Sequence, residues 1–178
     1  MTATAKQGDL IQDVTAAKRS LRGLDWMNFF MADVQMAVGA FVASYLAAGR
    51  QWDAAQVGLV VAAQNIATML AQPAAGALVD NSNRKNWLAA GAGAIVGAGC
   101  IAILMGRSTI AEAAIQIVIG VASAIFPPAI AALSLGLVGG SKLPRRVGRN
   151  EAWNHGGKVS LAVAAALAGT RLGPEWIF

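Results

Sequence analysis

Apolar residues in this chain are gathered into long blocks that are separated by short polar segments. Five such blocks run over about residues 26–48, 55–79, 87–105, 110–138 and 155–172. A helix rises 1.5 Å per residue, so about 20 mostly apolar residues cross a hydrocarbon core about 30 Å thick. The pattern therefore predicts an all-α fold, a polytopic transmembrane bundle of about five helices over residues 26–178, preceded by a polar lead over residues 1–25.

Composition supports a membrane location. Hydrophobic residues make up 56% of the 178 residues and charged residues 13%, whereas soluble domains carry about 25% charged residues. The first four blocks contain few charges, and a central Asp, Lys or Arg disfavours insertion by about 2.5–3.5 kcal/mol. The fifth block is short, rich in alanine and flanked by Lys158 and Arg171, so we expect it to insert with help from its neighbours.

The basic residues predict the orientation of the bundle. Short loops on the cytoplasmic side of a membrane carry an excess of Lys and Arg. With the N-terminus in the cytoplasm, only Arg50, Arg107 and Arg171 fall outside. The remaining bases fall inside: Lys6, Lys18, Arg19, Arg22, Arg84, Lys85, Lys142, Arg145, Arg146, Arg149 and Lys158. The net charge of +5 is therefore a topology signal, and no nucleic-acid partner is expected.

Polar side chains within the apolar blocks are candidates for a solute or ion site, because such residues usually face a bundle interior or a water-filled cavity. Asp33 lies in the first block. It is either a substrate, cation or proton site, or a structural residue that forms an interhelical hydrogen bond or stays protonated near the inner interface. Gln35 in the first block and Gln116 in the fourth are similar candidates.

A polar stripe is predicted on the second helix. Asn65, Thr68 and Gln72 are spaced at i, i+3 and i+7, so they share one face at the helical period. Such a stripe either lines a polar cavity or bonds to adjacent helices. Pro73 in the second block and the pair Pro127 and Pro128 in the fourth are expected to release backbone hydrogen bonds and kink their helices.

The sequence does not indicate an enzyme. It contains one His and one Cys, Cys100, and it lacks a spaced set of metal ligands and a glycine-rich loop followed by Lys and Ser or Thr. No catalytic residue, cofactor or metal is therefore predicted. Any transport by this chain would be facilitated or coupled to an ion or proton gradient.

The segment Gly76-Ala77-Leu78-Val79-Asp80-Asn81-Ser82-Asn83-Arg84-Lys85-Asn86-Trp87-Leu88 resembles the signature between the second and third helices of the major facilitator superfamily. Six positions are in register: Gly76, Leu78, Asp80, Arg84, Lys85 and Leu88. Asn81 replaces the usual base and Asn83 the second glycine, and Asn tolerates a positive φ angle better than most residues. The resemblance implies that Gly76, Asp80, Arg84 and Lys85 form a gating loop, in which Asp80 contacts the opposite half of the transporter.

Other patterns of the same superfamily fit less closely. Gln116 stands where the fourth-helix pattern has an arginine, and Leu161-Ala162 stands where the antiporter pattern of the fifth helix has Gly-Pro. Proton-coupled drug export of the familiar kind and antiport are therefore not predicted. The opening of the first helix and the lead into the fifth are similar to a subgroup of bacterial facilitator-type transporters of undefined substrate.

The resemblance covers nearly the whole chain but corresponds to the first five of twelve helices. Transporters of this superfamily consist of two halves with the substrate between them, and the family pattern implies that helices one and four line the cavity. Three hypotheses follow. The chain is an N-terminal fragment or half-transporter that a second half or a homo-oligomer completes; it is a non-transporting membrane module that binds a partner protein or lipid; or it is an inactive remnant. The first predicts a bacterial inner-membrane protein with a small-molecule solute.

Overall fold

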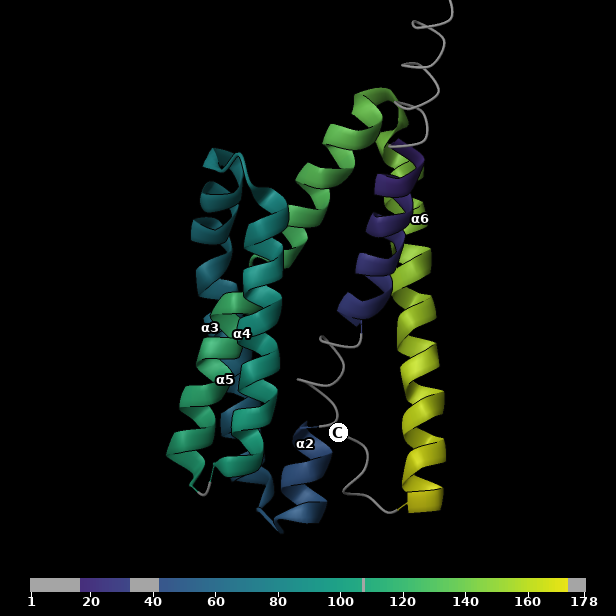
Figure 1. Cartoon of the computed structure of the whole chain (residues 1–178). Coiled ribbons are helices and arrows are strands. Elements are labelled where there is room, and N and C mark those ends of the chain that lie inside the picture. Colours follow the sequence, from purple (N-terminus) through teal and green to yellow (C-terminus); the bar gives the residue numbers. More distant parts are fainter. Residues whose placement is uncertain (1–16, 33–41, 107, 173–178) are drawn as a thin grey trace, which may run out of the picture.

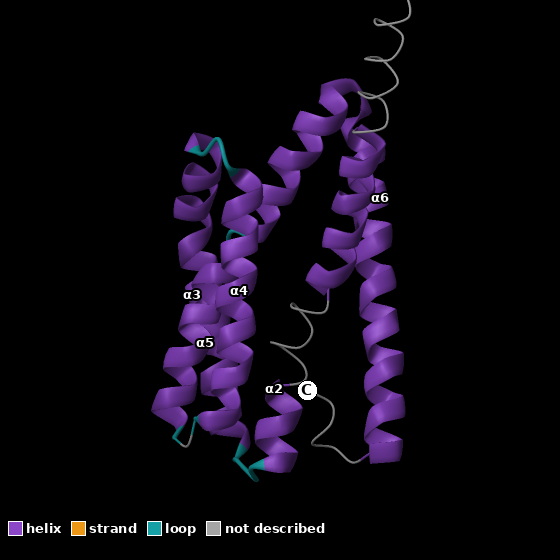
Figure 2. Ribbon diagram, viewed as in Figure 1, coloured by secondary structure: helices purple, strands orange, loops and turns teal. Residues whose placement is uncertain are grey.

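The computed structural model describes residues 17–32, 42–106 and 108–172, and every regular element in these ranges is helical. Asp33 and Gln35 lie outside the described residues. The first helix covers residues 17–32. The others, shown in Figures 1 and 2, are α2 (Val42–Ser44), the π-helical turn η2 (Tyr45–Gly49), α3 (Ala54–Asn81), α4 (Lys85–Met105), α5 (Thr109–Ser123) and α6 (Phe126–Leu172).

The helices form two groups that α6 connects. Helices α3, α4 and α5 pack together, and the contact between α3 and α5 is the most extensive one. The first section of α6 leads away from this group, and the rest of α6 then runs beside the helix over residues 17–32 (Figure 1). This arrangement brings the middle of the first helix next to the middle of α6, although the two are more than 100 residues apart in the sequence.

Local chemistry explains where several helices begin. Asp53 caps α3 because its carboxylate accepts from the backbone N–H of Gln56 at 2.8 Å, while the Gln56 side chain accepts from the backbone N–H of Asp53 at 3.3 Å. This reciprocal capping box satisfies two donors that the first turn leaves free. Ser108 caps α5 by accepting from the backbone N–H of Ala111 at 3.2 Å. Both helices therefore start at a side-chain cap.

The fourth apolar block is not a single helix. Helix α5 ends at Ser123 and α6 starts at Phe126. Pro127 and Pro128 thus lie in the first turn of α6, where the backbone N–H has no helical partner and proline is tolerated. The helix over 110–138 is thus interrupted close to these prolines, as expected, but the break lies at residues 124–125, just before them. Helix α3, in contrast, continues through Pro73.

The helix around the fifth block starts earlier than its apolar pattern indicates. Helix α6 is interrupted at Gly139, where φ is 70° and ψ is 170°, a conformation that glycine adopts without the steric penalty of a side chain. The chain is helical again after this residue and remains so to Leu172. The polar residues 140–154, which an apolar pattern cannot detect, are therefore part of the same helix as the predicted span. The first helix likewise begins within the predicted polar lead, since residues 17–25 are helical.

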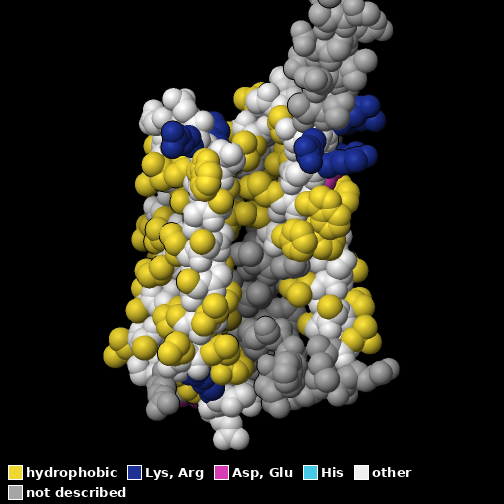
Figure 3. Space-filling model, viewed as in Figure 1, with side chains coloured by type: hydrophobic (Ala, Val, Ile, Leu, Met, Phe, Trp, Pro, Cys, Tyr) yellow, Lys and Arg dark blue, Asp and Glu magenta, His cyan; other side chains and the backbone are white. Residues whose placement is uncertain are grey.

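Hydrophobic side chains cover most of the molecular surface. Leu70, Trp87 and Ile110 are 70%, 71% and 84% exposed, and Figure 3 shows such residues over the whole length of the helices, with Lys and Arg gathered near the ends. Large exposed apolar surfaces mark contact with a membrane or a partner. Three helical stretches in the described residues, Ala54–Asn81, Lys85–Met105 and Thr109–Leu167, are long and apolar enough to cross a membrane.

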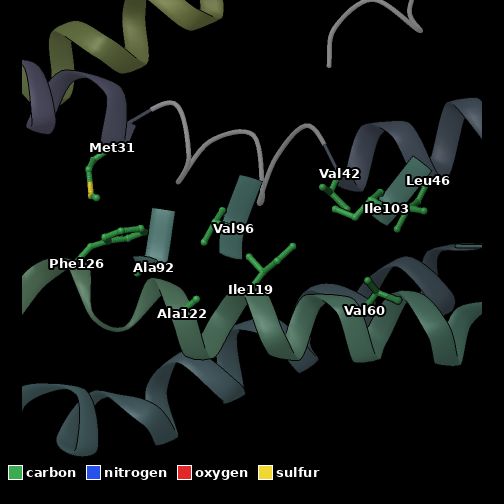
Figure 4. Packing of buried hydrophobic residues seen from close by; sticks show 10 residues of the cluster. All are labelled: Met31, Val42, Leu46, Val60, Ala92, Val96, Ile103, Ile119, Ala122 and Phe126. Atoms are coloured by element: carbon green, nitrogen blue, oxygen red, sulfur yellow. The ribbon is translucent and has the colours of Figure 1, made fainter. Parts of the chain in front are cut away.

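The apolar core lies where the helices meet. Val96 of α4, Ile119 of α5 and Val60 of α3 are fully buried, and Met31 and Phe126 extend the cluster toward the first helix and α6 (Figure 4). The core therefore links both helix groups. It also separates two sets of buried polar residues, one toward each end of the bundle.

Candidate functional site

Eight polar or charged side chains are buried among the described residues: Asp25, Asn28, Glu112, Gln116, Ser134, Arg146, Asn150 and Asn154. Burial of such groups is unfavourable unless they are paired or hydrogen-bonded. We call the end of the bundle with the α3–α4 turn and residues 142–149 the basic end, and the opposite end, with the turn between α4 and α5, the Arg50 end (Figures 1 and 3).

At the Arg50 end, Arg50 joins three elements. Its guanidinium Nη1 lies 3.1 Å from Oε1 of Glu112 on α5. It also donates to the main-chain oxygens of Ile103 at 2.9 Å, Leu104 at 3.2 Å and Gly106 at the end of α4. The last carbonyls of a helix have no hydrogen-bond donor within the helix, and the Arg50 guanidinium supplies donors for those of α4. The Arg50 side chain, which directly follows η2, thereby holds the end of α4 and the start of α5 together.

Glu112 and Gln116 present a polar face of α5 to the interior. They are spaced at i and i+4, which places them on one side of the helix. Glu112 is fully buried and Gln116 is 1% exposed. Within the described part of the chain, Oε2 of Glu112 and both amide atoms of Gln116 have no hydrogen-bond partner. These three atoms are therefore unsatisfied polar groups in an otherwise apolar part of the described bundle.

At the basic end, Asp25 binds two arginines of α6. Its Oδ1 accepts from Nη2 of Arg146 at 2.7 Å, and its Oδ2 accepts from Nη2 of Arg149 at 2.6 Å. Burial tends to raise the pKa of the Asp25 carboxyl, but the hydrogen bonds from Arg149 and Arg146 outweigh it and the pKa lies below its ordinary value. The hydrogen bond that Arg149 donates to the Asp25 carboxylate raises the pKa of Arg149. The cluster is therefore ionised.

Further polar contacts continue along the same face of α6. Arg146, Asn150 and Asn154 follow at intervals of four residues and are all buried. The Asn150 side chain donates to the Ser134 hydroxyl at 2.8 Å, and the Asn154 side chain donates to the main-chain oxygen of Asn28 at 3.4 Å. This polar face fixes the first helix against α6 and explains why residues 140–154 are helical despite their low hydrophobicity.

The predicted gating loop is a short turn at the basic end. Only residues 82–84 separate α3 from α4. The Lys85 ammonium donates to the main-chain oxygens of Val79 at 2.8 Å and Ser82 at 2.7 Å, so it caps the end of α3. Asp80 is exposed on the last turn of α3. The ion pairs among the described residues join Arg50 to Glu112 and Asp25 to Arg146 and Arg149, and Asp80 is in none of them.

The turn does not use the conformation expected of Asn83. Gln51 is the non-glycine residue with a positive φ angle in the described ranges, so Asn83 does not replace a glycine by adopting the left-handed region. The Ser82 hydroxyl accepts from the backbone N–H of Arg84 at 3.1 Å instead. Arg84 is exposed and Gly76 is half-buried one turn before Asp80. The turn is thus held by Ser82 and Lys85.

The polar stripe on α3 is divided between two environments. The Thr68 hydroxyl lies 3.0 Å from the Gln64 oxygen and 3.1 Å from the Gly120 oxygen of α5, so it bonds to an adjacent helix. A methyl group at Gly120 would come within 2.5 Å of the Gln64 oxygen, which means that only glycine allows this approach. Asn65 and Gln72 are exposed. The structure therefore brings Thr68, but not Asn65 or Gln72, into the helix interface.

Two features were missed from the sequence. The pair of Glu112 and Arg50 was one of them, although the sequence carries a signal for each residue. Glu112 is an acid inside an apolar block, which is the signal that marked Asp33, and Arg50 is one of few bases on its side of the predicted topology. The Asp25 cluster was also missed, because it joins residues 121 and 124 positions apart and no local pattern reports such a pairing. Of the predicted cavity residues in the described ranges, Gln116 is the one that lies fully buried without a partner there.

Comparisons with known proteins agree with the helical architecture. Residues 26–178 match the family described as the Major Facilitator Superfamily. Two curated relatives, from the CDC 1551 and H37Rv strains of Mycobacterium tuberculosis, are described as uncharacterised MFS-type transporters and are 38% identical over 165 residues. The matched part covers 93% of this chain but 40% of each relative. No solved structure matches.

Proposed function

Because this chain belongs to the major facilitator superfamily, we propose that it supplies the first helices of a secondary transporter that moves a small solute by alternating access. Transporters of this kind bind their substrate between two repeated halves. The chain spans 40% of the length of the relatives that it matches. In this proposal a second half, from further sequence or from another chain, completes the pathway.

The observation that carries the proposal is the buried polar face of α5. Intramembrane polar groups usually mark a substrate or ion pathway. Glu112 and Gln116 point three unpartnered atoms into the described bundle, and Glu112 is held by Arg50 at one end of the path. We assign Gln116 to solute binding, and Asp33, Gln35, Asn65, Thr68 and Gln72 remain candidates for the same cavity.

Asp80 is assigned a gating role at the basic end. Its exposure on the last turn of α3, outside the three ion pairs of the described residues, leaves its carboxylate open to a partner from the second half. Lys85 caps the helix end that presents it, and the exposed Arg84 is assigned to the same gating loop. The proposal places the basic end in the cytoplasm of a bacterial cell, because Lys and Arg concentrate on the cytoplasmic side of inner-membrane proteins.

Solute uptake into membrane vesicles tests this function. Vesicles from cells that produce the protein are compared with vesicles from cells that do not, using a panel of radiolabelled small solutes. At least one solute should enter faster when the protein is present. Gln116→Leu removes a hydrogen-bonding group that contributes about 1 kcal/mol, so it should slow that uptake by about fivefold.

The neighbouring residue supplies the control. Ile117 lies on the same helix and is exposed, so Ile117→Leu should leave uptake unchanged. If Gln116→Leu transports as fast as the unmodified chain, the assignment of this face to a solute pathway is wrong.

A further inference from the structure

Most of the residues that line a cavity at the basic end are cationic. It has a volume of about 430 Å³ and lies between the first helix and the part of α6 around the Gly139 break. Six of its lining residues are basic, namely Lys18, Arg22, Lys142, Arg145, Arg146 and Arg149, and one, Asp25, is acidic. The cavity therefore carries a large excess of positive charge.

The single acid neutralises only part of this charge. Asp25 pairs with Arg146 and Arg149. Lys18, Arg22, Lys142 and Arg145 are in none of the ion pairs of the described residues. Arg146 is 5% exposed, and its Nε has no hydrogen-bond partner within the described ranges. A buried guanidinium donor without an acceptor is unfavourable, and an anionic oxygen would satisfy it.

Aromatic residues beside the cavity indicate that such an anionic oxygen would come from a lipid headgroup. Trp26 directly follows Asp25, is 51% exposed, and lies with its ring centroid 5.6 Å from that of Trp153 and 5.8 Å from that of Phe30. Exposed Trp residues mark the headgroup level of a membrane. Figure 3 shows hydrophobic side chains directly beside the Lys and Arg group at this end. The basic cavity thus adjoins the lipid headgroup layer.

We propose that this cavity is a binding site for the phosphate of an anionic membrane lipid. The four unpaired bases and the Nε of Arg146 surround the phosphate, and the apolar side chains of Leu21 and Val138 in the lining contact the start of an acyl chain. A zwitterionic lipid fits less well, because its ammonium group would add positive charge next to this set of bases. Binding at this site would hold the first helix against α6.

Native mass spectrometry of the purified chain in detergent tests the proposal. The chain is incubated with phosphatidylglycerol, with phosphatidylcholine or with inorganic phosphate. Phosphatidylglycerol should be retained and phosphatidylcholine should not. Lys142→Gln and Arg145→Gln, both at exposed positions, should each weaken retention about fivefold, because a base near an anionic lipid contributes about that factor. Arg145→Lys keeps the charge and should retain most of the binding.

Arg19 provides a matched control. It is exposed on the first helix, next to Lys18, but does not line the cavity. Arg19→Gln should therefore bind phosphatidylglycerol as well as the unmodified chain. Equal losses in Arg19→Gln and Arg145→Gln would indicate diffuse surface attraction and overturn the site. Equal retention of the two lipids, or displacement of phosphatidylglycerol by millimolar inorganic phosphate, would overturn the lipid assignment. The readout is independent of transport.

Discussion

At the scale of single residues, Arg50 and Glu112 show how the bundle accommodates charge. The Glu112 side chain is fully buried, whereas that of Arg50 is 18% exposed. Arg50 also binds three main-chain oxygens at the end of α4. The two members of the pair are therefore not equivalent. When Glu112 is changed, Arg50 keeps its main-chain acceptors. When Arg50 is changed, Glu112 loses its only cationic partner among the described residues.

This asymmetry predicts unequal effects on stability. Removal of one partner from a buried ion pair destabilises by about 3–5 kcal/mol when it leaves a charge uncompensated. Arg50→Ala should therefore lower the melting temperature in detergent much more than Glu112→Gln, measured by circular dichroism. Arg84→Ala, at an exposed position of the basic end, serves as the control and should have almost no effect. A larger loss in Glu112→Gln than in Arg50→Ala would contradict this description of the pair.

At the scale of helices, the contact between α3 and α5 depends on small residues rather than on large hydrophobic ones. Lipid is as apolar as a hydrophobic side chain, so the hydrophobic effect does not drive helices together in a membrane. Gly120 is buried at this contact, and Gly99 of α4 is buried where α4 meets α5. A methyl group at Gly99 would come within 2.5 Å of Cγ1 of Ile119. In contrast, a methyl group at Gly93 or Gly97 would meet nothing within 4 Å. Gly93 and Gly97 of α4 have the Gly-x-x-x-Gly spacing that is common at helix contacts, but they mark no contact in the described bundle.

This difference gives a paired mutational test. Gly120→Val forces α3 and α5 apart and should destabilise by about 1–3 kcal/mol or more, as overpacking usually does. Gly97→Val adds the same atoms to an open surface, so it should be nearly neutral. Thermal unfolding of the two variants in the same detergent measures both. Equal losses would mean that the close approach at Gly120 does not hold these helices together.

The sequence pattern predicted the helical class and most of the long elements, because hydrophobic length reports directly on what can lie in lipid. It ended the fourth block at Val138, next to the break at Gly139. It predicted an irregularity at Pro127 and Pro128 but not that the helix ends before them, at residues 124–125, since an apolar run looks the same on both sides of the interruption. Nor did it reveal the helix over residues 140–154, which is stabilised by polar pairing with distant residues such as Asp25 and Asn28.

The candidate site was only partly visible for the same reason. A polar residue in an apolar block is easy to find, and Gln116 was found in this way. Whether its side chain faces lipid, another helix or a cavity depends on helix rotation. For α3 the structure shows that one stripe divides, with Thr68 bonded to Gly120 and Asn65 and Gln72 exposed. Periodicity places residues on a common face, but it does not say what that face contacts.

At the scale of the whole molecule, charge and hydrophobicity are segregated along one axis. The basic end carries the α3–α4 turn, the Asp25 cluster and the cationic cavity, and the opposite end carries Arg50 and the start of α5 (Figures 1 and 3). Between them, the described surface is largely apolar. This segregation is what a helical bundle threaded through a membrane requires, and it gives each end a definite side.

The most direct test of the account is the accessibility of the two ends in intact cells. In a Cys100→Ala background, Ala54→Cys reports on the Arg50 end and Asn83→Cys on the basic end, and both positions are exposed. A membrane-impermeant maleimide should label Ala54→Cys in intact cells, and Asn83→Cys only after the cells are permeabilised. Labelling of Asn83→Cys in intact cells together with protection of Ala54→Cys would contradict the proposed orientation, and labelling of both would contradict the membrane-spanning bundle itself.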